Sequence, residues 1–85
     1  MDLRTEVANK LDQANAVQII ETTGTVGSVF VFDKAKRGWI ELTSPEKQGW
    51  TSYSLVERIV DIAPHEMRKK GSMLVVAKID PMRAE

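Results

Sequence analysis

The chain has no cysteine, a single histidine and no long apolar run, and each absence excludes a class of protein. Without cysteine there is neither a disulfide framework nor a thiolate metal site, and one histidine falls short of the three or four ligands that zinc takes. No apolar run approaches the ~20 residues of a membrane-spanning helix, and the first residues lack the apolar core of a secretion signal. We therefore expect a cytoplasmic protein that has no cofactor and does not bind a membrane.

The chain also lacks an excess of charge of either sign. Lysine plus arginine and aspartate plus glutamate both total 12. Nucleic-acid binders usually carry a basic excess, because much of their affinity comes from neutralising phosphates. The balance argues against nucleic acid as the partner. Basic residues do gather at positions 34–37 and 68–70, so a nucleic-acid-binding small barrel remains an alternative function.

The 85 residues, 42% of them hydrophobic, are enough for one domain with a modest core. Its first part, residues 2–15, carries Leu3, Val7 and Leu11 at intervals of four, which predicts an amphipathic helix with Asp2 as its N-cap. Such a short helix is marginal alone. Its apolar stripe either packs on the rest of the chain or pairs with a partner or a second copy, so self-association is a further alternative.

Residues 16–62 have the pattern of β-strands. Apolar and β-branched runs at 17–22, 28–33, 38–42 and 56–62 are separated by turn-forming segments. Within the run 38–42, alternation places Ile40 and Leu42 on one face and Trp39 and Glu41 on the other. Because burying an unpaired Glu41 would be costly, we predict that Ile40 and Leu42 point into the core and Trp39 points outward. The alternative is that Trp39 packs under the N-terminal helix.

The last part of the chain predicts two short elements over residues 63–79. A helical turn over 65–70 would stop at Gly71, and a final strand would span 72–79. Asp80-Pro81 breaks that strand, so residues 80–85 are predicted to form a loose tail. The sequence shows neither a positioned pair or triad for acid–base or nucleophilic catalysis nor a phosphate-binding loop, so we expect no enzyme.

Two Gly-Trp pairs mark the middle of the chain: Gly38-Trp39, and the first two residues of the stretch 49–56, GWTSYSLV. This pattern resembles the Src-homology-3 superfamily. Its members carry a tryptophan at the start of one strand and, further along, Gly-aromatic-x-Pro-x-x-Tyr-Val on a short helical turn. The resemblance covers residues 16–62. It implies a mainly-β fold, a five- or six-stranded bent barrel with the helix at residues 2–15 added to it.

The resemblance supports the barrel more than the usual ligand of the family. The proline and tyrosine of the second motif help to line the family's groove for proline-rich peptides, and Ser52 and Leu55 stand in their places here. A proline-rich ligand stays among the alternatives, although the groove residues depart from the family.

From these residues we predict a non-catalytic protein–protein interaction module, an adaptor or targeting domain that binds another protein or peptide through exposed aromatic side chains. Flanking charges would orient the partner. The predicted partner-binding residues are Trp39, Glu41, Pro45, Glu46, Trp50 and Tyr53.

Overall fold

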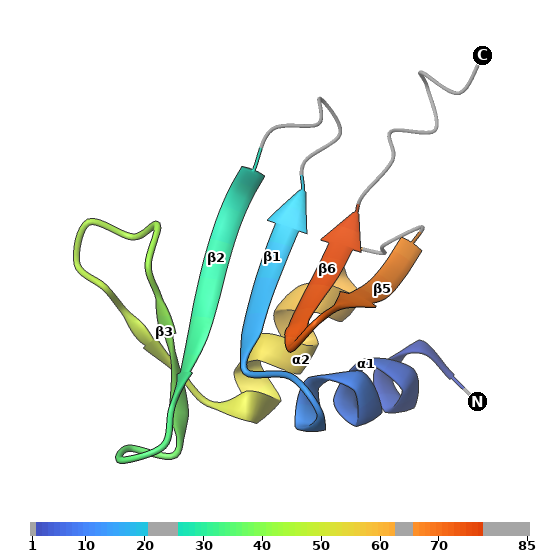
Figure 1. Cartoon of the computed structure of the whole chain (residues 1–85), viewed down its shortest axis with the longest axis horizontal. Coiled ribbons are helices and arrows are strands. Elements are labelled where there is room, and N and C mark those ends of the chain that lie inside the picture. Colours follow the sequence, from blue (N-terminus) through green and yellow to red (C-terminus); the bar gives the residue numbers. More distant parts are fainter. Residues whose placement is uncertain (1, 21–25, 63–65, 78–85) are drawn as a thin grey trace.

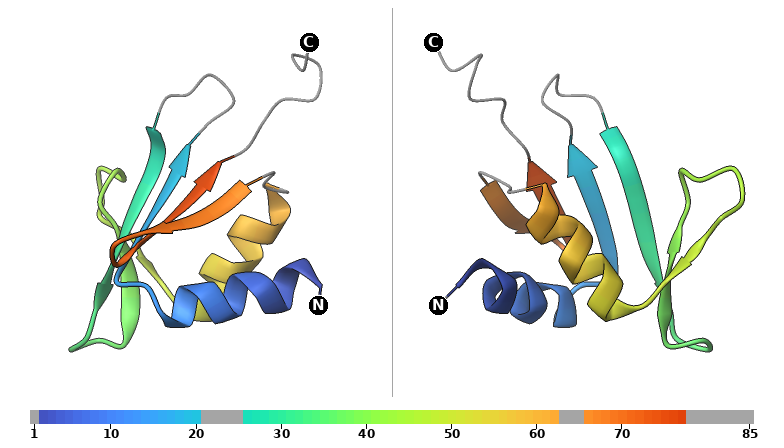
Figure 2. Two further views of the ribbon diagram at one scale, coloured as in Figure 1. Left: turned by 45° about the vertical axis from the view of Figure 1, so that its right-hand side comes forward. Right: turned by 180° about the vertical axis from the view of Figure 1, so that it is seen from behind.

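The computed structural model describes residues 2–20, 26–62 and 66–77. These form six strands and two helices, and the strands make one sheet in the order β4-β3-β2-β1-β6-β5. β1 and β6 run parallel, and every other neighbouring pair is antiparallel. Both helices lie on one face of the sheet (Figures 1 and 2). The elements are α1 (Leu3–Asp12), β1 (Ala16–Ile20), β2 (Val26–Asp33), β3 (Gly38–Glu41), β4 (Gly49–Trp50), α2 (Ser52–Asp61), β5 (Glu66–Lys70) and β6 (Met73–Ala77).

The predicted mainly-β class is confirmed, and the predicted barrel is not. β4 and β5 are the two edges of the sheet, and they do not pair with each other. The sheet therefore stays open, with one face under the helices and the other face free of helices among the described residues (Figure 2).

The predicted N-terminal helix is confirmed as α1. The Thr5 backbone N–H donates to Asp2 Oδ1 at 2.8 Å, so Asp2 is the N-cap. Val7 and Leu11 are buried, and α1 packs along α2, with an ion pair between Arg4 and the α2 residue Glu57. The apolar stripe is therefore covered by the same chain.

The predicted strand at residues 56–62 is wrong, because these residues belong to α2 and its C-cap. A capping box begins the helix: the Ser54 N–H donates to Thr51 Oγ1 and the Thr51 N–H donates to Ser54 Oγ, each at 3.0 Å. Leu55 and Ile59 are four residues apart and fully buried against the sheet. Burial at helical spacing thus outweighs the strand preference of the β-branched residues.

The predicted helical turn at 65–70 is also wrong over its described part. Glu66–Lys70 forms β5, which makes a hairpin with β6. Gly71 lies in the connecting turn with φ +65°, a conformation that favours glycine. The predicted last strand is confirmed as β6 within its described residues, while positions 63–65 and the predicted tail lie outside them.

The core lies between the helices and the inner face of the sheet. Paired strand residues project to the same face, and the pairs Val17 with Phe30 and Val17 with Leu74 put these three side chains together there. Each is at most 1% exposed. Leu55 and Ile59 close this layer from the helical side.

Trp39 is on this inner face, so its predicted outward orientation is wrong. The register pairs Phe32 with Trp39 and Phe30 with Glu41. Trp39 is 2% exposed, whereas Leu42, predicted to be in the core, is 50% exposed. The prediction assumed that an inward Glu41 would be buried without a partner. Glu41 is instead half-buried near the edge of the sheet, and its carboxylate accepts a hydrogen bond from the Trp50 indole N–H.

The cap of α1 should make stability depend on pH. The hydrogen bond from the Thr5 backbone N–H lowers the pKa of the Asp2 carboxyl below its ordinary value. A carboxyl with a lowered folded-state pKa contributes its stabilisation above the unfolded-state pKa, about 3.9, and loses it as the pH falls through the folded-state value. We expect the Tm of the wild type to drop more between neutral pH and acid than the Tm of Asp2→Asn, which caps without titrating. Circular-dichroism melts over that range measure the difference, and parallel curves would contradict the expectation.

Candidate functional site

The six predicted partner-binding residues do not form one surface. Trp39 and Tyr53 line a common groove, and Glu41 and Trp50 form a pair at the β3–β4 edge. Trp39 also pairs with Trp50 across the strands, and both line a second hollow described below. Pro45 and Glu46 are exposed in the turn between β3 and β4. Of the aromatic residues, Tyr53 is the one with a large exposed fraction, 69%.

Both tryptophans are held by specific contacts. The Trp39 indole N–H donates to Ser52 Oγ at 3.1 Å, and the ring lies 5.3 Å from that of Phe32. The Trp50 indole N–H donates to Glu41 Oε1 at 3.1 Å, and its ring meets Phe30 edge-on at 5.5 Å. These bonds satisfy both indole donors; the first ties β3 to the start of α2, and the second ties β4 to β3. Neither indole N–H is free to bind a ligand.

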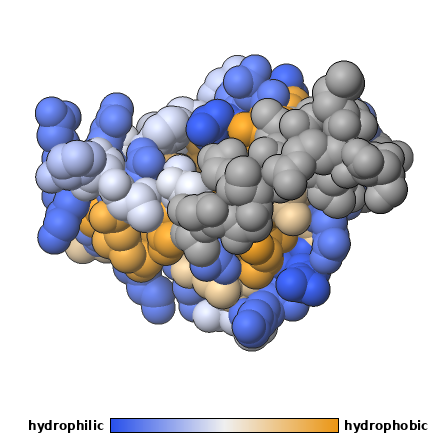
Figure 3. All heavy atoms as spheres, turned by 90° about the horizontal axis from the view of Figure 1, so that it is seen from above, coloured by the Kyte–Doolittle hydropathy of each residue, from blue (hydrophilic) through white to orange (hydrophobic). Residues whose placement is uncertain are grey.

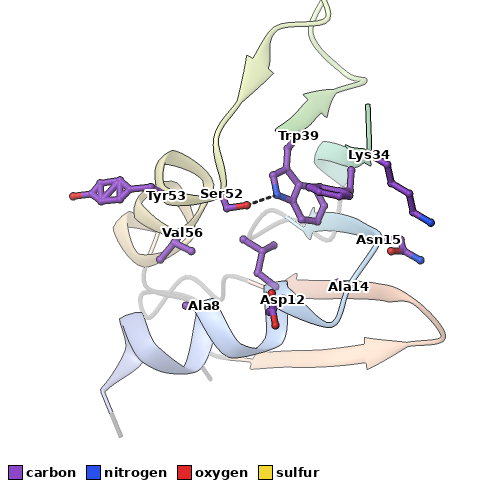
Figure 4. A pocket seen from close by; sticks show the side chains of 11 residues that line it. Ala8, Asp12, Ala14, Asn15, Lys34, Trp39, Ser52, Tyr53 and Val56 are labelled. Atoms are coloured by element: carbon purple, nitrogen blue, oxygen red, sulfur yellow. Dashed lines mark hydrogen bonds between the residues drawn. The ribbon is translucent and has the colours of Figure 1, made fainter. Parts of the chain in front are cut away.

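A groove of about 430 Å³ lies where α1, the first turn of α2 and the ends of β2 and β3 meet (Figure 4). We call it the helix groove. Its apolar lining comes from both helices and the sheet, and in Figure 4 the Trp39 ring stands above the α1 segment while the Tyr53 ring points outward from α2. The lining residues are Ala8, Leu11, Asp12, Ala14, Asn15, Phe32, Lys34, Trp39, Ser52, Tyr53 and Val56.

The polar groups of the helix groove stand at its rim. Asp12 and Lys34 are exposed, and neither forms an ion pair with another described residue. The Ser52 hydroxyl oxygen accepts the Trp39 indole bond, and no described histidine or carboxylate is hydrogen-bonded to that hydroxyl. The arrangement suits an apolar group flanked by polar or charged atoms. Within the described residues, no group of three histidine or acidic side chains is placed to hold a metal ion.

A second hollow, of about 320 Å³, was missed by the sequence analysis. It lies along β3 and β4, where Ile40 of β3 pairs with Gly49 of β4. Gly38, two residues before Ile40, is on the same face of β3. Lys36, Arg37 and Lys47 line it. We call it the basic hollow. The basic turn 34–37 was noticed, but Lys47 joins it only through the β3–β4 pairing, which the sequence did not reveal.

Comparison of this chain with protein-family models, with curated proteins and with solved structures gave no match. The likeness to the Src-homology-3 superfamily therefore rests on the residues quoted above. Neither α1 nor α2, the helices of the described residues, has the length and apolar character needed to cross a membrane.

The burial of Trp39 predicts a structural role in addition to its place beside the groove. Trp39→Ala should destabilise the fold by about 3–5 kcal/mol, because it removes a buried ring and leaves a cavity. In a domain of this size, about 1 kcal/mol lowers the Tm by about 4–8 °C. Tyr53→Ala removes an exposed ring and should change stability by at most about 0.5 kcal/mol. Thermal melts of the two variants test this, and a Trp39→Ala protein that melts like the wild type would disprove it.

Proposed function

We propose that this chain is a non-catalytic protein–protein interaction module whose helix groove holds an apolar side chain from a segment of a partner protein. The observation that carries the proposal is the groove itself: a concavity of about 430 Å³ lined by apolar side chains with polar ones at its rim, beside the exposed, outward-pointing Tyr53. Binding pockets in proteins commonly have this size and lining, with a few polar groups that fix orientation.

The groove lining explains how such a segment would bind. Leu11 and Val56 offer apolar surface from the two helices, and the small side chains of Ala8 and Ala14 leave room above them. Burying a leucine-sized side chain there contributes about 1.5–3 kcal/mol. Tyr53 adds a rigid ring that is apolar on its faces and polar at its hydroxyl, the kind of residue that often dominates interfaces.

Charge would set the direction in which the segment lies. Asp12, on α1, and Lys34, after β2, are both exposed at the rim. A segment with a basic residue near Asp12 and an acidic residue near Lys34 would be oriented by both. A segment lying in the reverse direction would place its basic residue near Lys34 and its acidic residue near Asp12. That repulsion would select one direction of binding more than it would raise the affinity.

The structure favours one apolar anchor over a proline-rich helix. Proline-rich ligands dock between exposed aromatic faces, and here Trp39 is 2% exposed, so Tyr53 alone offers an open ring. The proposal keeps from the Src-homology-3 resemblance the use of aromatic residues beside a helical turn, since Trp39 and Tyr53 both line the groove.

Filling the groove should abolish binding. We would select peptides from a random displayed library on the wild type and measure their affinity for Ala8→Phe and for Ala35→Phe. Ala8 is an exposed groove residue, and Ala35 is an exposed turn residue outside it, so the same substitution is made inside and outside the site. We expect binding at least about tenfold weaker for Ala8→Phe, a loss of about 1.4 kcal/mol, and no change for Ala35→Phe.

Both variants should melt like the wild type, because both positions are exposed. Selected peptides that bind Ala8→Phe as tightly as the wild type would place the interaction elsewhere on the chain. If selection enriches no peptide at all, the groove does not serve as a peptide site.

A further inference from the structure

The outer face of the sheet, opposite the helices, presents a patch of large apolar side chains. Val31 pairs directly with Ile40, and the Leu42 N–H donates to the Val29 carbonyl at 2.8 Å, which sets these two side by side in the next row. Val31 is 37% and Leu42 50% exposed. We call Val29, Val31, Ile40 and Leu42 the outer apolar patch.

On the central strands, register extends the row of Val31 through Ala16 to Met73, both partly buried. The row of Val29 leads to the polar Gln18 and to Val75, which is 3% exposed, so the exposed apolar surface is centred on the patch itself. Figure 3 shows that hydrophobic side chains reach the surface of the molecule and are bordered by hydrophilic ones. Contiguous apolar surface on a small domain, rimmed by polar residues, commonly marks a binding site.

Positive charge lies on both sides of this surface. At one end is the basic hollow with Lys36, Arg37 and Lys47. At the other end is β5, where the pairs Lys70 with Met73 and Arg68 with Val75 put both basic side chains on the outer face.

Nearby acidic groups offset part of this charge. Asp33 lines the hollow, and its Oδ1 accepts the backbone N–H groups of Ala35 and Lys36. Glu66 Oε1 lies 3.5 Å from Arg68 Nε, and both side chains are exposed. Lys36, Arg37, Lys47 and Lys70 form no ion pair with any described residue.

The backbone at the hollow is unusual. Arg37 has φ +52° and Lys47 has φ +47°, and these are the positive-φ residues other than glycine in the described chain. Such a conformation is uncommon for a residue with a side chain, whereas glycine adopts it freely. Two basic side chains are thus held in the left-handed region at the same cavity, a pattern often associated with function.

We propose that the outer face binds an acidic amphipathic segment of another protein. Apolar side chains of that segment would cover the outer apolar patch, and its carboxylates would point to the basic hollow and to Lys70. This surface lies on the opposite face of the sheet from the helices, so the inference does not depend on the helix groove.

Charge decides against a second copy as the occupant. If two outer faces pack with a two-fold axis along the strands, β5 of one copy lies over the basic hollow of the other. If the axis runs across the strands, β5 of one copy lies over β5 of the other, and the two basic hollows lie over each other. Both arrangements set basic groups against basic groups, which specifically disfavours self-pairing.

The test uses a fluorescein-labelled model peptide in which leucine alternates with glutamate, and a matched peptide with lysine in place of glutamate. Fluorescence anisotropy should show that the full chain binds the acidic peptide at least about tenfold more tightly than the basic one, and that salt weakens the binding. Leu42→Glu, a change at a half-exposed patch residue, should weaken it at least about tenfold. Lys36→Glu should weaken it severalfold, while the matched control Lys10→Glu, on α1, should leave it unchanged.

Thermal melts must first show that Leu42→Glu folds; if it does not, the neutral change Val31→Ser serves at the same patch. Equal affinity for the two peptides would overturn the proposal, as would weakening by Lys10→Glu equal to that by Lys36→Glu. The proposal would also be overturned if the wild type does not bind the acidic peptide but binds phosphatidylserine-containing vesicles or a single-stranded oligonucleotide, and if Lys36→Glu abolishes that binding. Light scattering that shows a dimer disrupted by Leu42→Glu would assign the face to a second copy instead.

Discussion

The parallel pairing of β1 with β6 is the constraint on which the rest of the structure depends. It joins residues 16–20 to residues 73–77 at the centre of the sheet. Parallel neighbours cannot be joined by a tight turn, so the intervening chain must cross over a face of the sheet. Here it first builds β2, β3 and β4 on one side of β1, and then returns through α2 to place β5 and β6 on the other side. Because α2 makes this return on one face and α1 packs beside it, the helical layer forms on that face alone.

This one-sided helical layer determines which surfaces are available for binding. On the inner face, the central strands and α2 bury Phe30, Ile59 and Leu74 almost completely. The layer ends toward β3, where Trp39 is covered by the start of α2 and the helix groove opens. On the outer face, neighbouring strands set apolar residues side by side with no helix above them in the described chain. The two proposed surfaces therefore lie on opposite sides of one sheet.

Sequence periodicity predicted the elements whose burial is one-sided and regular. α1 was recognisable because Leu3, Val7 and Leu11 recur at helical spacing behind an N-cap, and β6 because it is an uninterrupted apolar run. α2 was not, because its second half and its C-cap, residues 55–62, are rich in Val and Ile, which taken alone favour a strand. The signal that distinguishes the two was present: Thr51 and Ser54 have the spacing of a helix cap, and Leu55 and Ile59 are four residues apart.

The orientation of Trp39 could not be obtained from alternation, and the reason is physical. Alternation separates Trp39 and Glu41 from Ile40 and Leu42 but does not say which pair faces the core. The penalty for burying Glu41 would decide the matter only if β3 lay in the middle of the sheet. β3 lies one strand from the edge, where a half-buried carboxylate can accept the Trp50 indole N–H. There the cost of placing Glu41 inward is small, while burying the Trp39 ring against Phe32 gains far more than burying Leu42 would. The larger apolar side chain therefore takes the inner face, and the smaller ones are left on the outer face.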